Sequence, residues 1–207
     1  MDFPRSSGKK LDASENSCRV INKVLIIDDM KSSKGFTLLE LMVTLAVSAI
    51  LIFVAVPSFV SFIRNSQMTT QANAFFTDLS LTKSEAVKRN ARVSICASAD
   101  SITCSGSTNW ATGWIVFTDA SGASGVLDGA DELLRVHDEI KGEATLISNG
   151  DAYVQFTPSG YASTYTDAAA TEIFFTLDHS NCTGDQKRVI SVAPFGRVEV
   201  ERQACGT

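Results

Sequence analysis

The stretch "KGFTLLELMVTLAVSAILIFVAVPSF", residues 34–59, decides the fold. After Lys34 it carries a single charge, Glu40, and the next charged residue is Arg64. This apolar run can form a helix of roughly 20 residues, the length that spans the hydrocarbon core of a bilayer. An ionised carboxylate at the centre of a lone membrane helix costs about 2.5–3.5 kcal/mol, so such a residue usually has a function and a partner. We therefore expect a cation near Glu40.

The best cation for Glu40 is a new amino terminus. Lys34 lies more than one helical turn away, at the edge where basic residues set the orientation of a membrane segment. Cleavage between Gly35 and Phe36 would place an α-amine on Phe36 at nearly the membrane depth of Glu40. Pairing of that amine with Glu40 of a neighbouring chain would select one register of packed helices, since any other stagger leaves both charges unpaired in a low dielectric.

Residues 34–59 resemble the class III signal of type IV pilins and type II secretion pseudopilins. The motif of that family is a basic leader ending in Gly, then Phe, Thr, Leu, a hydrophobic residue and Glu. It is matched here by Lys34, Gly35, Phe36, Thr37, Leu38, Leu39 and Glu40. The resemblance implies that a prepilin peptidase cleaves after Gly35 and N-methylates Phe36, and that Glu40 guides docking into a growing filament. Pro57 matches the position where such helices bend, so a kink is expected there.

Two other interpretations of the apolar segment stay open, a cleavable general secretion signal and a plain signal anchor. A cleavable secretion signal has an apolar core of roughly 7 to 15 residues followed by a small-residue site, and it has no use for Glu40. The leader itself, residues 1–35, is polar and contains an internal methionine, Met30. Translation from Met30 would shorten the leader to the basic sequence "MKSSKG".

A second helical pattern follows over residues 58–90. Apolar or small residues recur there at spacings of four and three, which marks one face of an amphipathic helix: Met68, Ala72, Phe75, Leu79, Thr82 and Ala86. Together with a transmembrane or filament-core segment over residues 36–57, one helix ending near Arg89 would extend roughly 80 Å at 1.5 Å per residue.

Residues 91–207 change to a period of two and predict a β-rich head. The candidate strands are 92–97, 113–119, 132–137, 144–148, 153–157, 172–177, 188–192 and 196–201. Antiparallel hairpins that pack against the amphipathic helix give an α+β fold. Such packing would bury Phe75, Leu79, Trp114, Val116, Phe156, Phe174 and Val198.

Four of the five cysteines lie in this head, and an even set favours disulfides in an oxidising compartment. Of three possible pairings, the shortest loops favour Cys96 with Cys104 and Cys182 with Cys205. The fifth, Cys18, lies in the leader. Zinc is the less favoured alternative because the sequence has no CxxC pair. We expect no metal and no cofactor.

The stretches "LTKSEAVKRNARVSICAS", residues 81–98, and "GRVEVERQAC", residues 196–205, extend the resemblance over the head. They are similar to the branch of the family that contains FimT, FimU and the pseudopilin GspH. From Lys34 onward the resemblance covers almost the whole chain, although its motifs are specific only in the first segment.

No catalytic constellation is visible, and the chain is predicted not to be an enzyme. The histidines, His137 and His179, have no nucleophile or metal motif beside them. The acidic loop "DASGASGVLDGADE", residues 119–132, invites a calcium hypothesis, but Ser121 and Ala123 stand at the third and fifth positions where the EF-hand pattern needs Asp or Asn. We expect a solvated hairpin loop.

DNA binding is a further hypothesis. FimT-type pilins implicated in DNA uptake carry a C-terminal Gly-Arg-x-Arg, whereas this chain has Gly196 and Arg197 but Glu199 in place of the second Arg. Residues that would form a basic patch are Lys187, Arg188, Arg197 and Arg202. From Arg64 onward the chain has 11 Lys and Arg against 17 Asp and Glu, so this acidic head is a poor general polyanion binder.

The sequence thus predicts a non-catalytic minor pilin or pseudopilin near the filament tip. The resemblance implies a precursor in the bacterial inner membrane with its head in the periplasm, and a filament subunit after assembly. Its expected partners are other pilins, the prepilin peptidase and the inner-membrane assembly platform. Three alternatives stay open: a pseudopilin for protein export, a DNA-binding pilin for transformation, and a membrane-anchored enzyme.

Overall fold

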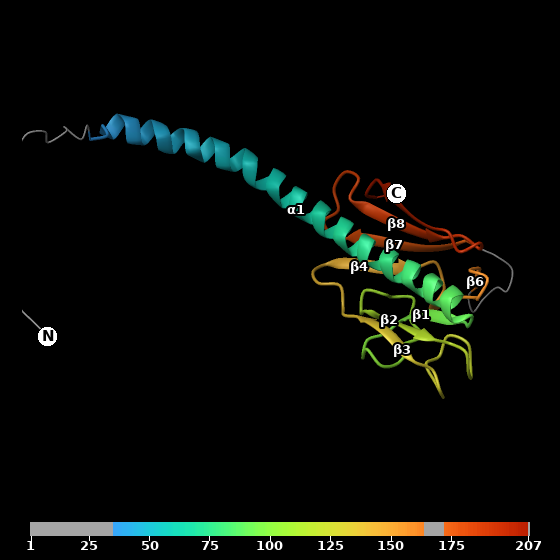
Figure 1. Cartoon of the computed structure of the whole chain (residues 1–207). Helices are drawn as coiled ribbons and strands as arrows, with labels where there is room; N and C mark the ends of the chain where they lie inside the picture. Colours follow the sequence, from blue (N-terminus) through green and yellow to red (C-terminus); the bar gives the residue numbers. More distant parts are fainter. Residues whose placement is uncertain (1–34, 164–171, 207) are drawn as a thin grey trace, which may run out of the picture. The chain divides into compact units, whose positions relative to one another are not determined.

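The computed structural model describes residues 35–163 and 172–206 (Figure 1). Residues 1–34 of the expected leader, with Cys18 and Met30, lie outside the described residues. One helix, α1 (Leu38–Arg89), precedes all the strands. The strands are β1 (Val93–Ala97), β2 (Trp114–Thr118), β3 (Leu133–His137), β4 (Ala144–Ser148), β5 (Tyr153–Phe156), β6 (Ala162–Ser163), β7 (Ile173–His179), β8 (Lys187–Val192) and β9 (Val198–Gln203).

The chain divides into two compact units after Ser48, and α1 contributes residues to both. The helical assignment is continuous through Pro57, which lacks an N–H and so cannot donate to the preceding turn. The expected kink at Pro57 stays a prediction.

The C-terminal end of α1 is closed by a Schellman motif. Asn90 adopts a left-handed φ of 50°, its N–H donates to Val87 O at 3.3 Å, and the Ala91 N–H donates to Ala86 O at 3.2 Å. Lys88 and Arg89 lie in the last turn, where positive charge suits the helix dipole. These local signals explain why the helix ends at the predicted position.

The strands form two antiparallel sheets. Sheet A has the order β3-β2-β1-β5-β6 and sheet B the order β4-β7-β8-β9. The central strand β1 is buried along its whole length. Ile95 on one face joins the main core, whereas Cys96 on the other joins a smaller cluster with Ile115 and Phe117.

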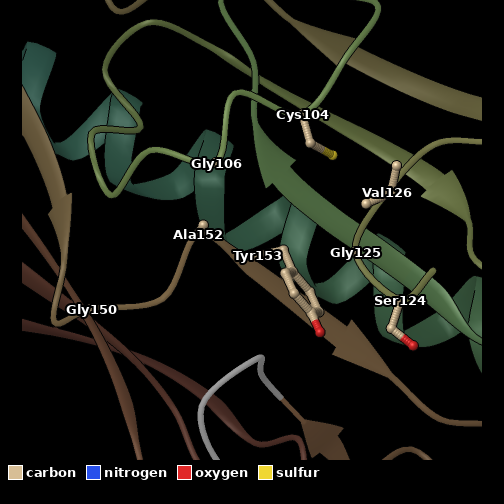
Figure 2. A pocket seen from close by; sticks show the side chains of 8 residues that line it. All are labelled: Cys104, Gly106, Ser124, Gly125, Val126, Gly150, Ala152 and Tyr153. Atoms are coloured by element: carbon tan, nitrogen blue, oxygen red, sulfur yellow. The ribbon is translucent and has the colours of Figure 1, made fainter.

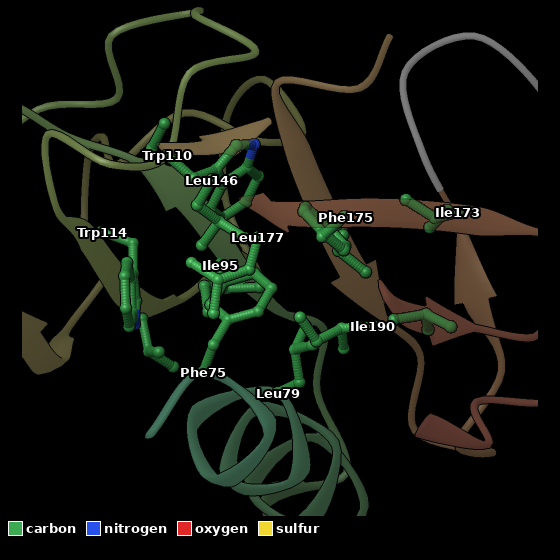
Figure 3. Packing of buried hydrophobic residues seen from close by; sticks show 14 of the residues in the cluster. Phe75, Leu79, Ile95, Trp110, Trp114, Leu146, Ile173, Phe175, Leu177 and Ile190 are labelled. Atoms are coloured by element: carbon green, nitrogen blue, oxygen red, sulfur yellow. The ribbon is translucent and has the colours of Figure 1, made fainter. Parts of the chain in front are cut away.

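Phe75 joins the helix to both sheets (Figure 3). Its ring meets Trp110 at 5.5 Å, Trp114 at 5.0 Å and Phe175 at 4.7 Å between centroids, in edge-to-face geometry. Trp114 belongs to sheet A and Phe175 to sheet B. Aromatic pairs of this kind contribute about 0.5–1.5 kcal/mol each beyond the area that they bury.

The predicted α+β class is confirmed, and all eight expected strands are present. Two parts of the prediction need correction. The two-residue strand β6 was not expected, because it is too short to show a period. Phe174 was expected in the core but is 38% exposed, since the buried face of β7 is formed by Ile173, Phe175 and Leu177. Val198 is half-buried and packs against the core.

The register of β7 generates a matched pair of substitutions. Phe175→Ala should lower the free energy of unfolding by about 3–5 kcal/mol because it removes a buried ring. Phe174→Ala should change it by about 1 kcal/mol or less. Urea denaturation followed by tryptophan fluorescence on the detergent-solubilised chain measures both. Equal losses would show that the assigned faces of β7 are wrong.

Candidate assembly site

The start of α1 carries a helix cap. Thr37 Oγ1 accepts a hydrogen bond from the Glu40 N–H at 3.1 Å, and Thr37 O accepts from the Leu41 N–H at 3.1 Å. Thr37 and Glu40 therefore occupy the first and last positions of a T-x-x-E capping box, a signal that the sequence analysis missed. Glu40 also lies in the first helical turn, where the helix dipole favours a negative charge.

The first half of α1 and Phe36 just before it expose apolar side chains. Phe36 is 78% exposed and Phe53, within the helix, is 85% exposed. Thr44 Oγ1 donates to Leu41 O at 2.9 Å and Ser48 Oγ donates to Thr44 O at 2.6 Å, so these hydroxyls are satisfied within the helix. Among the described residues, α1 is the helix that is long and apolar enough to cross a membrane. Such a surface suits lipid or other apolar helices.

The head is fastened to α1 just beyond the apolar run. Gln186 Nε2 donates to Ser61 Oγ at 2.9 Å and to Ser61 O at 3.2 Å. Arg188, which is 2% exposed, donates to Asn65 Oδ1 at 2.6 Å and to Thr69 Oγ1 at 3.2 Å. These contacts join β8 and the turn before it to the helix.

Two disulfides close loops in the head. Cys96 is joined to Cys104 and Cys182 to Cys205, which is the pairing that the short loops favoured. Inside the first loop, Asp100 accepts hydrogen bonds from the hydroxyl and N–H of Thr103 and from the Ile102 N–H. These donors lower the pKa of Asp100. The carboxylate of Asp100 therefore stabilises the conformation of the loop closed by the Cys96–Cys104 disulfide.

A buried carboxylate lies on the helix face that packs against sheet A. Asp78 is 1% exposed, and its Oδ2 accepts from Trp114 Nε1 at 2.8 Å. Arg135 Nε lies 2.9 Å from Oδ1, an ion pair without the alignment of a good hydrogen bond. His137 Nδ1 is 3.6 Å from Oδ2, and the ring of His137 stacks on Trp114 with centroids 3.9 Å apart. His137 is thus held between Asp78 and Trp114, two contacts that the residues around it in the sequence did not predict.

The acidic loop after β2 uses its carboxylates internally. Asp119 is fully buried and its Oδ2 accepts from Ser94 Oγ at 2.5 Å, Gln155 Nε2 at 2.5 Å and the Gly125 N–H at 2.7 Å. Asp131 accepts from the Ala120 N–H at 3.1 Å. In the described ranges, no three His, Cys, Asp or Glu side chains are placed to hold a metal ion. The geometry gives these carboxylates a role in folding the loop.

A hollow of about 400 Å³ lies beside this loop (Figure 2). Tyr153, Val126 and the disulfide-bonded Cys104 line it, together with Ala152, Ser124 and three glycines. None of its lining residues is a free acid, base or thiol. This is a mainly apolar depression, without the convergent polar groups that mark a catalytic site.

Comparisons with known proteins agree with this architecture. The model of the family "Type II transport protein GspH" matches residues 71–196, which is more than half of the chain. The chain belongs to the GspH family. A second model, the prokaryotic N-terminal methylation motif, matches residues 30–56. A search of curated proteins found no match.

Among solved structures, the chain is similar to the type IV minor pilin FimU of Pseudomonas aeruginosa strain PAO1. One crystal form is 25% identical, with a TM-score of 0.52, and the match covers 70% of this chain and 98% of that one. A second form is 26% identical with a TM-score of 0.49, covering 66% and 98%. Members of the wider pilin family are generally structural proteins.

The four basic residues suggested for DNA do not form one surface in this GspH-family head. Arg188 is buried between sheet B and α1, which corrects its assignment to a surface patch. Arg197 is exposed but forms an ion pair with Glu199 at 3.2 Å. Arg202 lies near the other end of β9, opposite Arg188, and Lys187 is paired with Gln203 in the strand register. Burial, ion pairing and separation all weaken the attraction to phosphates.

His137 predicts a pH dependence of stability. Burial is the main cause that lowers its pKa below 6.5, with Arg135 adding to it and Asp78 and Asp138 opposing it. The unfolded chain then binds a proton before the folded one, so stability should fall as the pH drops below about 6.5. His137→Gln should flatten this slope in urea titrations between pH 7.5 and 5.5. The control His179→Gln should keep it, and a steep slope in His137→Gln would contradict the assignment.

Proposed function

We propose that the chain is a minor pilin of a type IV pilus. The apolar half of α1 packs against the helices of neighbouring subunits, and the head lies at or near the filament tip. The observation that carries this proposal is a methylation motif on a helix that continues into a head resembling FimU. The exposed apolar surface of α1 supplies the driving force for helix packing.

The proposed assembly begins with cleavage after Gly35 and N-methylation of Phe36. The new amine on Phe36 pairs with Glu40 of an adjoining subunit and fixes the stagger of the helices, because both charges would otherwise be unpaired in an apolar medium. The cap formed by Thr37 supports this pairing. It stabilises the first turn of α1, which contains Glu40, and so fixes the position of the carboxylate close to Phe36 in the sequence.

A pseudopilin of a type II secretion system is the second candidate. It is favoured by the match of the head to the family described as type II transport protein GspH. Both candidates use the same helix packing and the same pairing of Glu40, so they differ in the partners of the filament and in its biological output.

The charge of Glu40 can be tested apart from its capping role. Glu40→Gln keeps a capping-box residue but removes the charge, and it should lower incorporation into filaments about tenfold or more, the change produced by about 1.4 kcal/mol. Thr37→Val weakens the cap, keeps the charge and should assemble better than Glu40→Gln. Immunoblots of sheared filaments against total membranes give the ratio. Normal incorporation of Glu40→Gln would refute the pairing.

Deletion of the gene separates the two filaments. A minor pilin of a type IV pilus predicts loss of surface pili and of twitching motility, with secretion of folded exoproteins unchanged. The chain with both disulfides intact should restore the phenotype from a plasmid. Loss of exoprotein secretion with normal twitching would reject the pilus and favour the pseudopilin.

A further inference from the structure

A polar hollow of about 350 Å³ lies where α1 meets the turn before β8 and the end of β9. The helix contributes Ser58, Ser61, Phe62 and Asn65, the turn contributes Thr183, Asp185 and Gln186, and β9 contributes Arg202. All of these residues belong to the unit that begins at Ala49. Neither Arg202 nor this hollow takes part in the proposed pairing of Glu40.

The residues that form the helix wall of the hollow follow the apolar segment directly in the sequence. Residues 36–57 would span about 33 Å as a helix, close to the roughly 30 Å of a bilayer hydrocarbon core. Ser58 is the next residue, and Asn65 lies about 10 Å further along the helix axis. If residues 36–57 cross the membrane as proposed, Ser58 is the first residue beyond the hydrocarbon core and lies at the depth of the headgroups.

Two arginines are placed against each other beside this hollow. Arg188 on β8 and Arg202 on β9 are direct partners in the antiparallel register, so their side chains leave the same face of sheet B. Like charges in that position destabilise a sheet. An anion bound beside both guanidinium groups would offset their repulsion.

The buried member of the pair lacks a counter-ion. The guanidinium of Arg188 donates to neutral oxygens, including Asp185 O at 2.8 Å and Lys187 O at 3.1 Å, and no carboxylate in the described ranges forms an ion pair with it. Burial lowers the pKa of Arg188, the charge of Arg202 lowers it further, and Asp185 raises it. Asp185, which also lines the hollow, opposes this lowering but forms no ion pair with Arg188 within the described residues.

We propose that this hollow binds the phosphate of a phospholipid headgroup. Arg202, which is exposed and reaches the hollow from β9, supplies the main contact, because guanidinium and phosphate form strong charge-assisted hydrogen bonds. The hydroxyl of Ser58 adds a donor from the helix. Arg188 acts through its charge from behind Asn65 and does not touch the ligand. The bound lipid would hold the head against the membrane surface before assembly.

The inference rests on the proposed membrane anchoring, and the test reads the two separately. The full chain is reconstituted in phosphatidylglycerol nanodiscs, and native mass spectrometry after mild detergent release counts the lipids that stay bound. Arg202→Gln should lower the retained lipid about tenfold. Arg197→Gln removes the same charge from the residue just before β9, at the end of the strand away from Arg202, and should retain lipid like the parent chain.

Several outcomes would overturn the headgroup site. Equal retention by Arg202→Gln and the parent rejects it, and so does an equal loss in Arg197→Gln, which would indicate attraction by net charge. If inorganic phosphate binds the detergent-solubilised chain as tightly as the lipid does, the site is a free-anion site. Reduced co-purification of other pilins by Arg202→Gln, with lipid retention unchanged, would make it a protein contact.

Anchoring is measured by flotation of the same proteins with vesicles. Parent, Arg202→Gln and Arg197→Gln should all float, because the apolar half of α1 is identical in them. A parent chain that fails to float would overturn the anchoring and the lipid site together. Floating chains with no selective loss in Arg202→Gln would overturn the lipid site alone. Filament assembly enters neither measurement, so the proposed function is judged independently.

Discussion

The contact of Phe75 with rings from both sheets is the constraint on which the head depends. In the described part of the chain, one face of each sheet packs into the core that it shares with the helix and the opposite sheet, while the second face of sheet A buries the smaller cluster around Cys96. A single aromatic side chain at the middle of this core therefore fixes the rotation of α1 about its axis. Asp78, one turn further along, then points at Trp114 and Arg135.

Polar contacts complete what the apolar core begins. Asp78 and Arg188 are both nearly inaccessible to solvent, and each links the helix to a different sheet through hydrogen bonds or an ion pair. Buried charges add little net stability compared with apolar residues of the same shape. In a different packing of helix and sheets, however, they would be buried without their partners, which is strongly unfavourable. They therefore favour one arrangement of helix and sheets over near neighbours of similar apolar contact.

Sequence patterns predicted the elements well because the signals are local. The spacing of Phe75 and Leu79 defined the buried face of α1, and the alternation in each strand located the sheets. The assignment failed at Phe174, where two adjacent phenylalanines fit either face and only the pairing of β7 with β4 and β8 selects Phe175. The junction contacts of Arg188 could not be predicted either, since they join residues 123 and 119 positions apart.

The order of elements along the chain has a consequence for biogenesis. The helix that must be covered is made before every strand, whereas β7 and β8, which cover part of it, are made late, with only β9 after them. Until the late strands are synthesised, Phe75 and its neighbours lack part of their tertiary contacts. Contacts between residues this far apart in sequence also form slowly. During this interval the apolar face of α1 around Phe75 is exposed, and it needs protection by a chaperone or by the bilayer surface.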